Sequence, residues 1–472
     1  MTAVPLGDLP QAVSHSGRAS ASKLPADAPD FHLGAGGLAI FTGPGFPVAA
    51  LGLPLVVSLP EFYANYVGVK LAVVGLVFML IRLVDLAVDP FLGAMMDVTR
   101  TRLGRFRPWM IAGSPVLMVA TYMTFMAAPG AGALYMAAWL LALYLGYSIL
   151  VLSHAAWAST LASGYNARSR IYSWVQNAAV LGMVLVLFLP PIVGPMFPAN
   201  HAAGVQAMGW FIILLTPITV ALAVWRTPEP APLQQVRPRL DLKTFLSLAR
   251  RPAVSKILIA DICLAMAPAI SGALFIFFFR EARGFTTTQT TLLLLIYFLG
   301  GLAGAPLWTW LARRIGKHRA LIAAALHFSV MMSLTLILPK GAFALTAPFF
   351  FITGLAFSAA TIMLRAMLAD AADEAEYDRG DNRTGILFAM ITTTSKIGNA
   401  VAVGLSFPIL QAVGFAPRAG AHNTPSALLG LELLFVVAPV VFSLIAALAL
   451  RGYHLDEKTH REICAMLKAR TA

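Results

Sequence analysis

Apolar segments long enough to cross a membrane recur along the whole of this 472-residue chain. A helix needs about 20 mostly apolar residues to span the hydrocarbon core of a bilayer. Twelve windows meet this requirement, and polar or basic turns separate them. They lie near 37–59, 68–96, 109–128, 133–161, 173–193, 207–225, 254–279, 289–311, 319–338, 343–368, 384–412 and 427–450. The pattern predicts an all-α polytopic membrane protein with twelve transmembrane helices.

The polar break after the sixth window is the widest, and it contains Pro228, Pro230, Pro232 and Pro238. We therefore predict two six-helix halves with a linker between them. The predicted parts are a disordered cytoplasmic tail over 1–35, a first bundle over 36–226, a cytoplasmic linker over 227–253, a second bundle over 254–450 and a cytoplasmic tail over 451–472.

Composition supports this class, because 59% of the residues are hydrophobic and only 12% are charged, whereas a soluble domain is about 25% charged. The net charge of +13 does not indicate a nucleic-acid partner, since the basic residues cluster at the ends of the apolar windows. Their concentration in alternate turns predicts that both termini are cytoplasmic. The first 35 residues have no apolar core, so we expect no cleavable signal peptide. Two cysteines, Cys263 and Cys464, imply no disulfide framework.

Two turns of the chain resemble each other. RLGRFRPW follows the second window and RRIGKHRAL follows the eighth, with Gly104 and Gly316 in equivalent places. The pattern is typical of the major facilitator superfamily, although two independent basic loops would look similar. Parallel halves of this kind place a substrate site between them, near the midplane of the bilayer.

Three charged residues interrupt the second window. Arg82, Asp85 and Asp89 lie three and four residues apart, so they share one face of a helix. Charges at this depth are costly and normally face a cavity or a partner. The two aspartates are about 6 Å apart along the helix axis, so both carboxylates can reach one small cation. The alternative is an ion pair of Arg82 with one aspartate that only holds two helices together.

Lys396 lies about a dozen residues into the eleventh window, where a buried lysine needs an acidic partner. Asp85 or Asp89 is the available partner across the midplane. Hydroxyl groups just before the lysine can supply neutral oxygens for a cation or a substrate; they belong to Thr392, Thr393, Thr394 and Ser395. Asp261 and Glu432 are further candidates for a proton path, but the sequence identifies no partner for either.

Polar residues in the fourth and fifth windows are candidates for substrate binding. They are Ser153, His154, Trp157, Gln176 and Asn177. A histidine titrates near neutral pH and can relay protons, and a tryptophan ring can stack on a flat ligand face. Hydrogen bonding within the bundle and core packing are the alternatives for these two side chains.

Charged residues at the predicted cytoplasmic ends are candidates for a gate. The set comprises Arg105, Arg107, Asp370, Asp373, Glu376 and Arg383. Ion pairs between the acidic block and the basic turns would close that side in one conformation and release it in another. The alternative is a solvated loop.

From Arg82 to Gly93 the chain reads R-x-x-D-x-x-x-D-P-x-x-G, followed by D-x-T-R-T-R-x-G-R-F-R-P-W. Together with ADAADEAEY, Arg383 and Lys396, this resembles the glycoside–pentoside–hexuronide:cation symporter family, the melibiose-carrier group of the major facilitator superfamily. The resemblance covers all twelve windows. It implies that Asp85 and Asp89 bind a coupling ion, H⁺ or Na⁺, close to Lys396 and Thr392, and that no cofactor or further metal is required.

The chain departs from the sugar-transporting members of that family. Ala49 and Ser153 stand at the places of two acidic residues that hold sugar hydroxyls, and WVQNAAV lacks the arginine of the fifth helix. An apolar residue near Leu150 replaces a threonine that assists sodium. These differences disfavour melibiose itself as the substrate.

The predicted function is cation-coupled symport of a small organic solute, a sugar, glycoside or uronate, by alternating access. The resemblance also extends to lysophospholipid carriers, so a transporter of lysophospholipids or other amphiphiles is the alternative. A transport-dead sensor is disfavoured, because no large soluble output domain is present. An enzyme is disfavoured because no metal-ligand cluster, nucleophile elbow or phosphate loop is found. We expect a monomer in the bacterial inner membrane, with a small-molecule substrate and the lipid bilayer as its partners.

Overall fold

The computed structural model describes residues 34–161, 165–197, 200, 202–229, 242–379, 384–418 and 421–471. Over these residues the chain is helical and forms no β-strand, apart from a single bridge between Thr101 and Gly104. Most of the tail predicted over 1–35 and the middle of the predicted linker lie outside the described residues.

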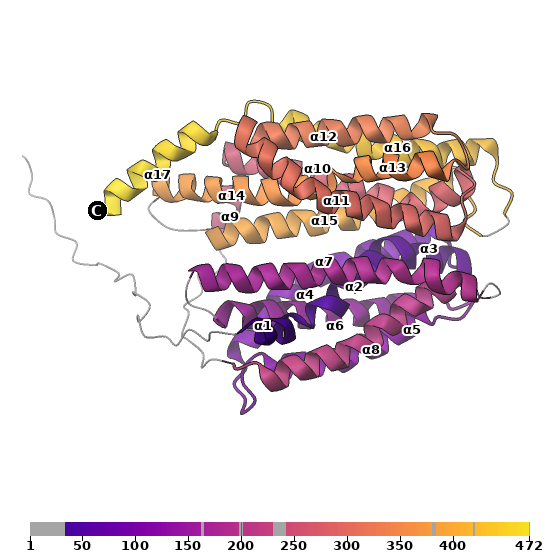
Figure 1. The fold of residues 1–472 in the computed structure, drawn as a ribbon, viewed down its shortest axis with the longest axis horizontal. Helices are drawn as coiled ribbons and strands as arrows, with labels where there is room; N and C mark the ends of the chain where they lie inside the picture. The colour runs from indigo at the N-terminus through magenta and orange to yellow at the C-terminus, as the bar shows by residue number, and fades with distance from the viewer. Residues whose placement is uncertain are drawn as a thin grey trace, which may run out of the picture.

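The first half is built from the N-terminal elements, drawn in indigo and magenta in Figure 1. Its first span is made of short pieces: α1 (Ala35–Thr42), α2 (Gly45–Leu53), η1 (Pro54–Ser58), α3 (Leu59–Phe62) and η2 (Tyr63–Val67). Five longer helices follow: α4 (Leu71–Val98), α5 (Arg107–Phe125), α6 (Ala133–Thr160), α7 (Tyr165–Met196) and α8 (Ala203–Arg226).

The second half lies beside the first and is drawn in orange to yellow (Figure 1). Its elements are α10 (Pro252–Phe277), η3 (Phe278–Ala282), α11 (Thr287–Ile315), α12 (Lys317–Leu334), η4 (Thr335–Ile337), α13 (Phe343–Gly354), α14 (Phe357–Arg379), α15 (Thr384–Ala412) and α16 (Pro425–Ala449). Two helices lie outside the spans, α9 (Leu242–Ala249) before this half and α17 (Glu457–Thr471) after it.

Eleven helices in the described ranges are long and apolar enough to cross a membrane. The remaining predicted span is α5, which has 19 residues and packs against α6 and α8 within the first half. The fold class predicted from the sequence, an all-α membrane protein with two six-helix halves, is therefore confirmed.

Proline explains the broken course of the first span. Pro54 opens the π-helical turn η1, and Pro60 lies in the single turn α3 that follows. A proline has no backbone N–H to donate and its ring crowds the preceding turn, so a helix bends or widens there. The first span is therefore not one continuous α-helix.

The tenth span is broken at Leu355, between α13 and α14. A Cβ atom on Gly304 of α11 would lie 2.0 Å from the Leu355 carbonyl oxygen, so only glycine allows these two backbones to approach so closely. The break frees that carbonyl from helical bonding, and the Trp308 indole N–H donates to it over 2.7 Å. A backbone group left unpaired inside a membrane is costly, so this side-chain donor stabilises the break.

Contacts between the halves run along α4 and α15. A Cβ atom on Gly404 would lie 2.3 Å from the Met79 sulfur, which shows how closely these helices approach. Near the same end, the Ala72 backbone N–H donates to Gln411 Oε1 over 2.8 Å. Glu61 of α3 and Arg280 of η3 form an ion pair across the halves at 3.0 Å. The halves are thus joined at the end where α4 begins and α15 finishes.

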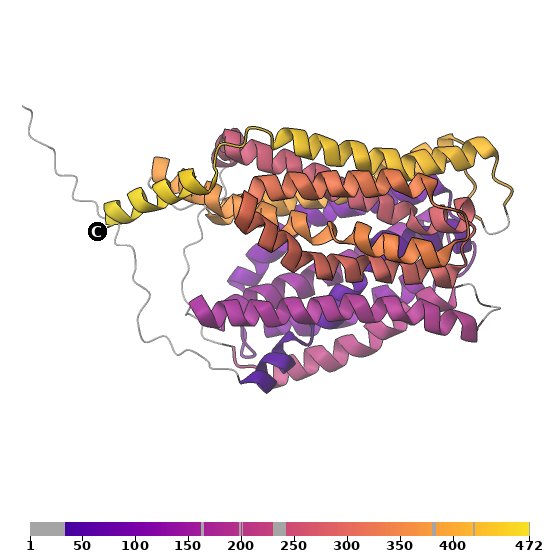
Figure 2. The same ribbon diagram turned by 45° about the horizontal axis from the view of Figure 1, so that its top comes forward.

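The last helix, α17, extends beyond the end of the bundle, beside the end of α14 (Figures 1 and 2). Asp456 lies just before it and accepts hydrogen bonds from the backbone N–H of Thr459 at 2.9 Å and from its hydroxyl at 3.0 Å. Both bonds lower the pKa of the Asp456 carboxyl, and the bond from the Thr459 backbone N–H has the larger effect. The carboxylate caps the first turn, which explains why the helix begins here.

Candidate functional site

Lys396 of α15 binds both aspartates of α4 and so connects the two halves near the middle of these helices. Its Nζ lies 2.9 Å from Asp85 Oδ2 and also donates to Asp89 Oδ2. The contact predicted from the sequence between the buried lysine and the two acids is present. The cation-binding role of the three residues stays a prediction.

Two carboxylates share one ammonium group, so the three ionised side chains carry a net charge of −1. Asp85 is buried, and its other oxygen, Oδ1, accepts a hydrogen bond of 2.6 Å from the Ser148 hydroxyl. Asp89 Oδ1 is also buried, but it has no hydrogen-bond partner among the residues that the structure describes. This buried carboxylate oxygen can accept a proton or coordinate a small cation.

Arg82 does not pair with either aspartate in this conformation. Its Nε donates to the Tyr144 hydroxyl over 2.7 Å, and its Nη1 donates to the Asn399 carbonyl over 3.1 Å. The alternative drawn from the sequence, an ion pair of Arg82 with one helix acid, is absent. Arg82 instead helps to hold α4 against α6 and α15.

The hydroxyl run before Lys396 divides between two environments. Thr392 is exposed, and its hydroxyl donates to the Phe388 carbonyl of its own helix over 2.9 Å. Thr394 and Ser395 instead donate to the buried Asp261 of α10, at 2.6 Å and at 2.8 to 2.9 Å. No partner of Asp261 was predicted from the sequence, although the run of hydroxyls beside Lys396 was the available signal.

A cavity of about 330 Å³ opens beside Asp261 in the second half. Pockets for small ligands start at about this volume. Polar side chains in its wall include Asp261, Thr361, Arg365, Ser395 and Asn399. The rest of the wall is apolar and comes from α10, α14 and α15, with Phe357 and Leu264 among its residues. Arg365 lies close enough for its charge to act on the Asp261 carboxylate.

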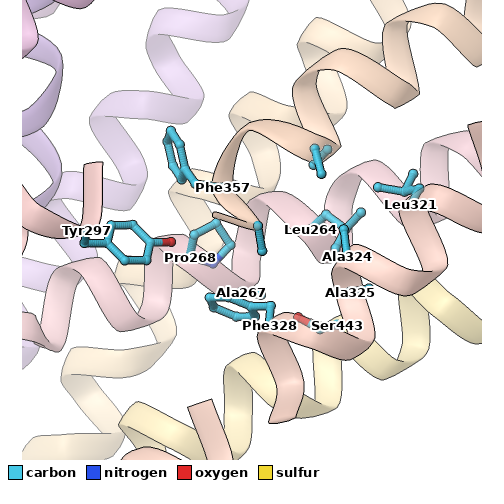
Figure 3. A pocket seen from close by; sticks show the side chains of 13 residues that line it. Leu264, Ala267, Pro268, Tyr297, Leu321, Ala324, Ala325, Phe328, Phe357 and Ser443 are labelled. Atoms are coloured by element: carbon cyan, nitrogen blue, oxygen red, sulfur yellow. The ribbon is translucent and has the colours of Figure 1, made fainter. Parts of the chain in front are cut away.

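A second cavity lies among the helices of the second half and is drawn in Figure 3. Its volume is about 40 Å³, and its wall is almost wholly apolar apart from Tyr297 and Ser443. It shares Leu264, Pro268 and Phe357 with the larger cavity. This space is too small for an organic solute, so we assign the candidate substrate site to the larger cavity.

Three candidates for substrate binding on α6 are buried within the first half. Ser153 donates to the Ile149 carbonyl over 2.6 Å, and His154 Nε2 lies 2.8 Å from the Phe41 carbonyl oxygen. The Trp157 indole N–H donates to the Pro228 carbonyl over 3.2 Å. Ser153 thus bonds within its own helix, whereas His154 contacts α1 and Trp157 contacts the start of the linker, which matches the alternatives given for these two side chains.

Gln176 and Asn177 lie on α7, and both are exposed. Neither belongs to the wall of the two cavities. Their role in substrate binding stays a prediction.

The basic members of the candidate gate are bound inside the first half. Arg105 pairs with Asp97 at the end of α4. Arg107 donates to the Thr227 carbonyl, and Glu229 accepts hydrogen bonds from the backbone N–H groups of residues 105–107. These contacts fix the basic turn to the start of the linker.

The acidic members of the candidate gate are bound inside the second half. Asp370 of α14 pairs with Lys317 at 2.6 Å, and Asp373 lies 2.9 Å from His460 of α17. Glu376 lies further along α14, and Arg383 is outside the described residues. Asp370 and Asp373 thus have partners within the second half, and the gate between the halves stays a prediction.

Glu432, for which the sequence also offered no partner, has a nearby arginine. Its Oε1 lies 3.7 Å from Arg283, which also donates to the carbonyls of Leu336 and Leu338. This contact lies within the second half and gives Glu432 a structural role in this conformation.

Two six-helix halves with charged residues at their interface define a polytopic membrane transporter. A family model described as "MFS/sugar transport protein" matches residues 40–457. Because this match covers most of the chain, the protein belongs to that family of the major facilitator superfamily, and it is a transporter and not an enzyme.

Comparison with known proteins finds relatives across most of the chain. The chain is 24% identical over 411 residues to a glucuronide carrier protein homolog of Escherichia coli, covering 85% of this chain and 89% of the relative. It is 25% identical over 413 residues to the isoprimeverose transporter of Lactiplantibacillus pentosus, covering 84% of each. It is 23% identical over 425 residues to the human sodium-dependent lysophosphatidylcholine symporter 1, covering 82% of this chain and 77% of the relative.

Among solved structures, the nucleoside transporter NupG in its D323A form matches with a TM-score of 0.66 and 11% sequence identity. The match covers 89% of this chain and 99% of NupG. At this level of identity the likeness supports the fold alone.

Proposed function

We propose that this protein is a cation-coupled symporter that accumulates a small organic solute, a sugar, glycoside or uronate, by alternating access. The observation that supports this most strongly is the lysine of one half bound to the two aspartates of the other half. Such a site is buried enough to require a counter-ion and lies at the interface that must rearrange during transport.

In this mechanism the coupling ion, H⁺ or Na⁺, competes with Lys396 for Asp85 and Asp89. The bound cation replaces the lysine ammonium as the counter-charge of the two carboxylates and releases the lysine, which weakens one contact between the halves and changes the conformational balance. A cation and a solute that favour the same conformation enhance each other's binding by the same factor. Asp89 Oδ1, which is buried and has no hydrogen-bond partner among the described residues, is a carboxylate oxygen that the ion can bind.

The solute is proposed to bind in the cavity beside Asp261. A carboxylate and neutral hydroxyl and amide groups can bind the hydroxyls of a sugar, and Arg365 can bind a carboxylate in a bidentate manner. The printed names of two relatives, a glucuronide carrier homolog and an isoprimeverose transporter, support this class of solute. The lysophosphatidylcholine symporter supports the alternative, an amphiphile.

A thermal-shift screen of the purified protein tests this proposal and is our first prediction. Bound solute raises the apparent stability by an amount that grows with the logarithm of the ratio of its concentration to its Kd. We expect glycosides or uronates to raise the midpoint more with the coupling ion than without it. Arg365→Gln should reduce the shift given by uronates more than the shift given by neutral glycosides. Stabilisation by lysolipids alone would favour the amphiphile alternative.

The orientation in the membrane is a second prediction. We propose that both termini and α9 face the cytoplasm, because lysine and arginine are concentrated on that side. In a variant with Cys263 and Cys464 replaced by serine, single cysteines are placed at the exposed positions Ala128 and Arg250. An impermeant thiol reagent added to intact cells should label Ala128→Cys and spare Arg250→Cys. The reverse pattern would overturn the orientation.

A further inference from the structure

The last helix, α17, lies beside the end of α14 (Figures 1 and 2). Three side chains that bind metals well meet between these two helices. His460 Nε2 lies 2.9 Å from Asp373 Oδ2. Cys464 Sγ lies 3.5 Å from His460 Nε2 and 4.0 Å from Asp373 Oδ2. The cluster lies outside the cavity and the ion pair to which transport is assigned above.

The spacing fits one tetrahedral ion. With zinc bonds of about 2.3 Å to sulfur and about 2.0 to 2.2 Å to nitrogen or oxygen, neighbouring ligand atoms of a tetrahedron lie roughly 3.4 to 3.6 Å apart. The three observed separations lie within about half an ångström of these values. His460 and Cys464 are four residues apart on α17, so they share one helical face, and Asp373 approaches from the other helix.

The surroundings allow a fourth ligand. The side chains of His460 and Asp373 are 23% and 42% exposed, so a water molecule from solvent can reach the centre of the cluster. Asp370 Oδ1 is also near, at 3.6 Å from His460 Nε2, although Lys317 holds that carboxylate. A site with three protein ligands and a water is an arrangement that zinc accepts.

We propose that Asp373, His460 and Cys464 bind a divalent transition-metal ion of the zinc class, which fastens α17 to α14. The neutral imidazole donates the lone pair of Nε2, and Asp373 binds as a carboxylate. The Cys464 thiol releases its proton to solvent as the metal–sulfur bond forms. A sulfur, nitrogen and oxygen set favours zinc-like ions over Mg²⁺ or Ca²⁺, which prefer oxygen ligands alone. Because α14 also carries Arg365, metal binding restrains a helix that lines the larger cavity.

Cobalt titration of the purified full-length protein, stripped of metal with a chelator, tests this proposal. Co²⁺ replaces Zn²⁺ in such sites and absorbs light when a thiolate binds it. We expect one equivalent of Co²⁺ to bind with a thiolate-to-cobalt absorption band and one equivalent of Zn²⁺ to displace it. Cys464→Ser should remove the band, and His460→Gln should weaken Zn²⁺ binding at least tenfold.

Two matched variants control for general effects. Cys263→Ser removes the buried thiol of α10, and His454→Gln removes a histidine that pairs with Glu374 of α14 at 3.0 Å outside the cluster. Both should keep the cobalt band and the zinc affinity. If the wild-type protein shows no band, or if Cys464→Ser binds Zn²⁺ as tightly as the wild type, the contact of His460 with Asp373 only attaches two helices.

Discussion

Uphill accumulation of solute is expected to be lost when Asp85 and Asp89 are both replaced with asparagine. Asparagine keeps the shape of each side chain but removes the negative charge that holds the coupling ion. In proteoliposomes with an imposed Na⁺ or pH gradient, the internal-to-external ratio of solute should fall to about one. Downhill flux or exchange should survive in part, because solute binding relies on the cavity beside Asp261.

Asp378→Asn is the matched control. Asp378 is an exposed aspartate of α14 that forms an ion pair with Arg251 at 3.0 Å, outside the proposed cation site. This variant should accumulate solute as the wild type does. If the double variant still concentrates solute with unchanged dependence on pH and sodium, then the coupling site lies elsewhere. Asp261, Glu432 and His154 would be the next candidates.

The second large effect concerns Lys396→Gln, which leaves the two carboxylates of α4 without their ammonium partner. Removing one member of a buried ion pair costs about 3 to 5 kcal/mol, and the 31% exposure of Lys396 brings the expected loss to the lower end of that range or below it. We expect the Lys396→Gln variant to have a lower midpoint of thermal unfolding than the wild type. Adding the coupling ion should raise the midpoint of the variant more than it raises that of the wild type. Recovery with sodium at fixed pH indicates Na⁺, and recovery only on acidification indicates H⁺.

Lys340→Gln is the control for loss of a lysine, since Lys340 is exposed in a turn between spans. It should leave the midpoint and its cation dependence unchanged. Combining Lys396→Gln with Asp85→Asn should restore part of the lost stability, because one unpaired carboxylate is removed with the lysine. A Lys396→Gln protein as stable as the wild type, with no response to either ion, would contradict the proposed site.

The amino-acid sequence alone was enough to predict most of the fold. Apolar windows of spanning length, separated by basic turns, encode the helices, and the prolines of the first span encode its kinks. Lys396 was assigned to the two aspartates because a charge inside an apolar window requires a partner, and few partners were available. This reasoning depends on the cost of burying charge, so it holds for buried charges and fails for exposed ones.

Contacts that depend on helix rotation could not be predicted in the same way. His154 and Trp157 have the chemistry of binding residues, but only the structure shows that α1 and the start of the linker bring the Phe41 and Pro228 carbonyls to them. The meeting of Asp373 with His460 and Cys464 depends on the path of α17. The sequence contained the spacing of His460 and Cys464, but nothing in it placed them beside Asp373.

In the proposed symport mechanism, the ion pair of Lys396 would also affect the rate at which the empty transporter returns to the conformation that loads solute. After unloading, a symporter must return through its occluded state with neither ion nor solute bound. Two bare carboxylates would carry a charge of −2 through a region shielded from water, whereas the lysine reduces it to −1. In this mechanism the lysine would take the place of the missing ion, which would lower the barrier of the return step and limit leakage of the ion without solute.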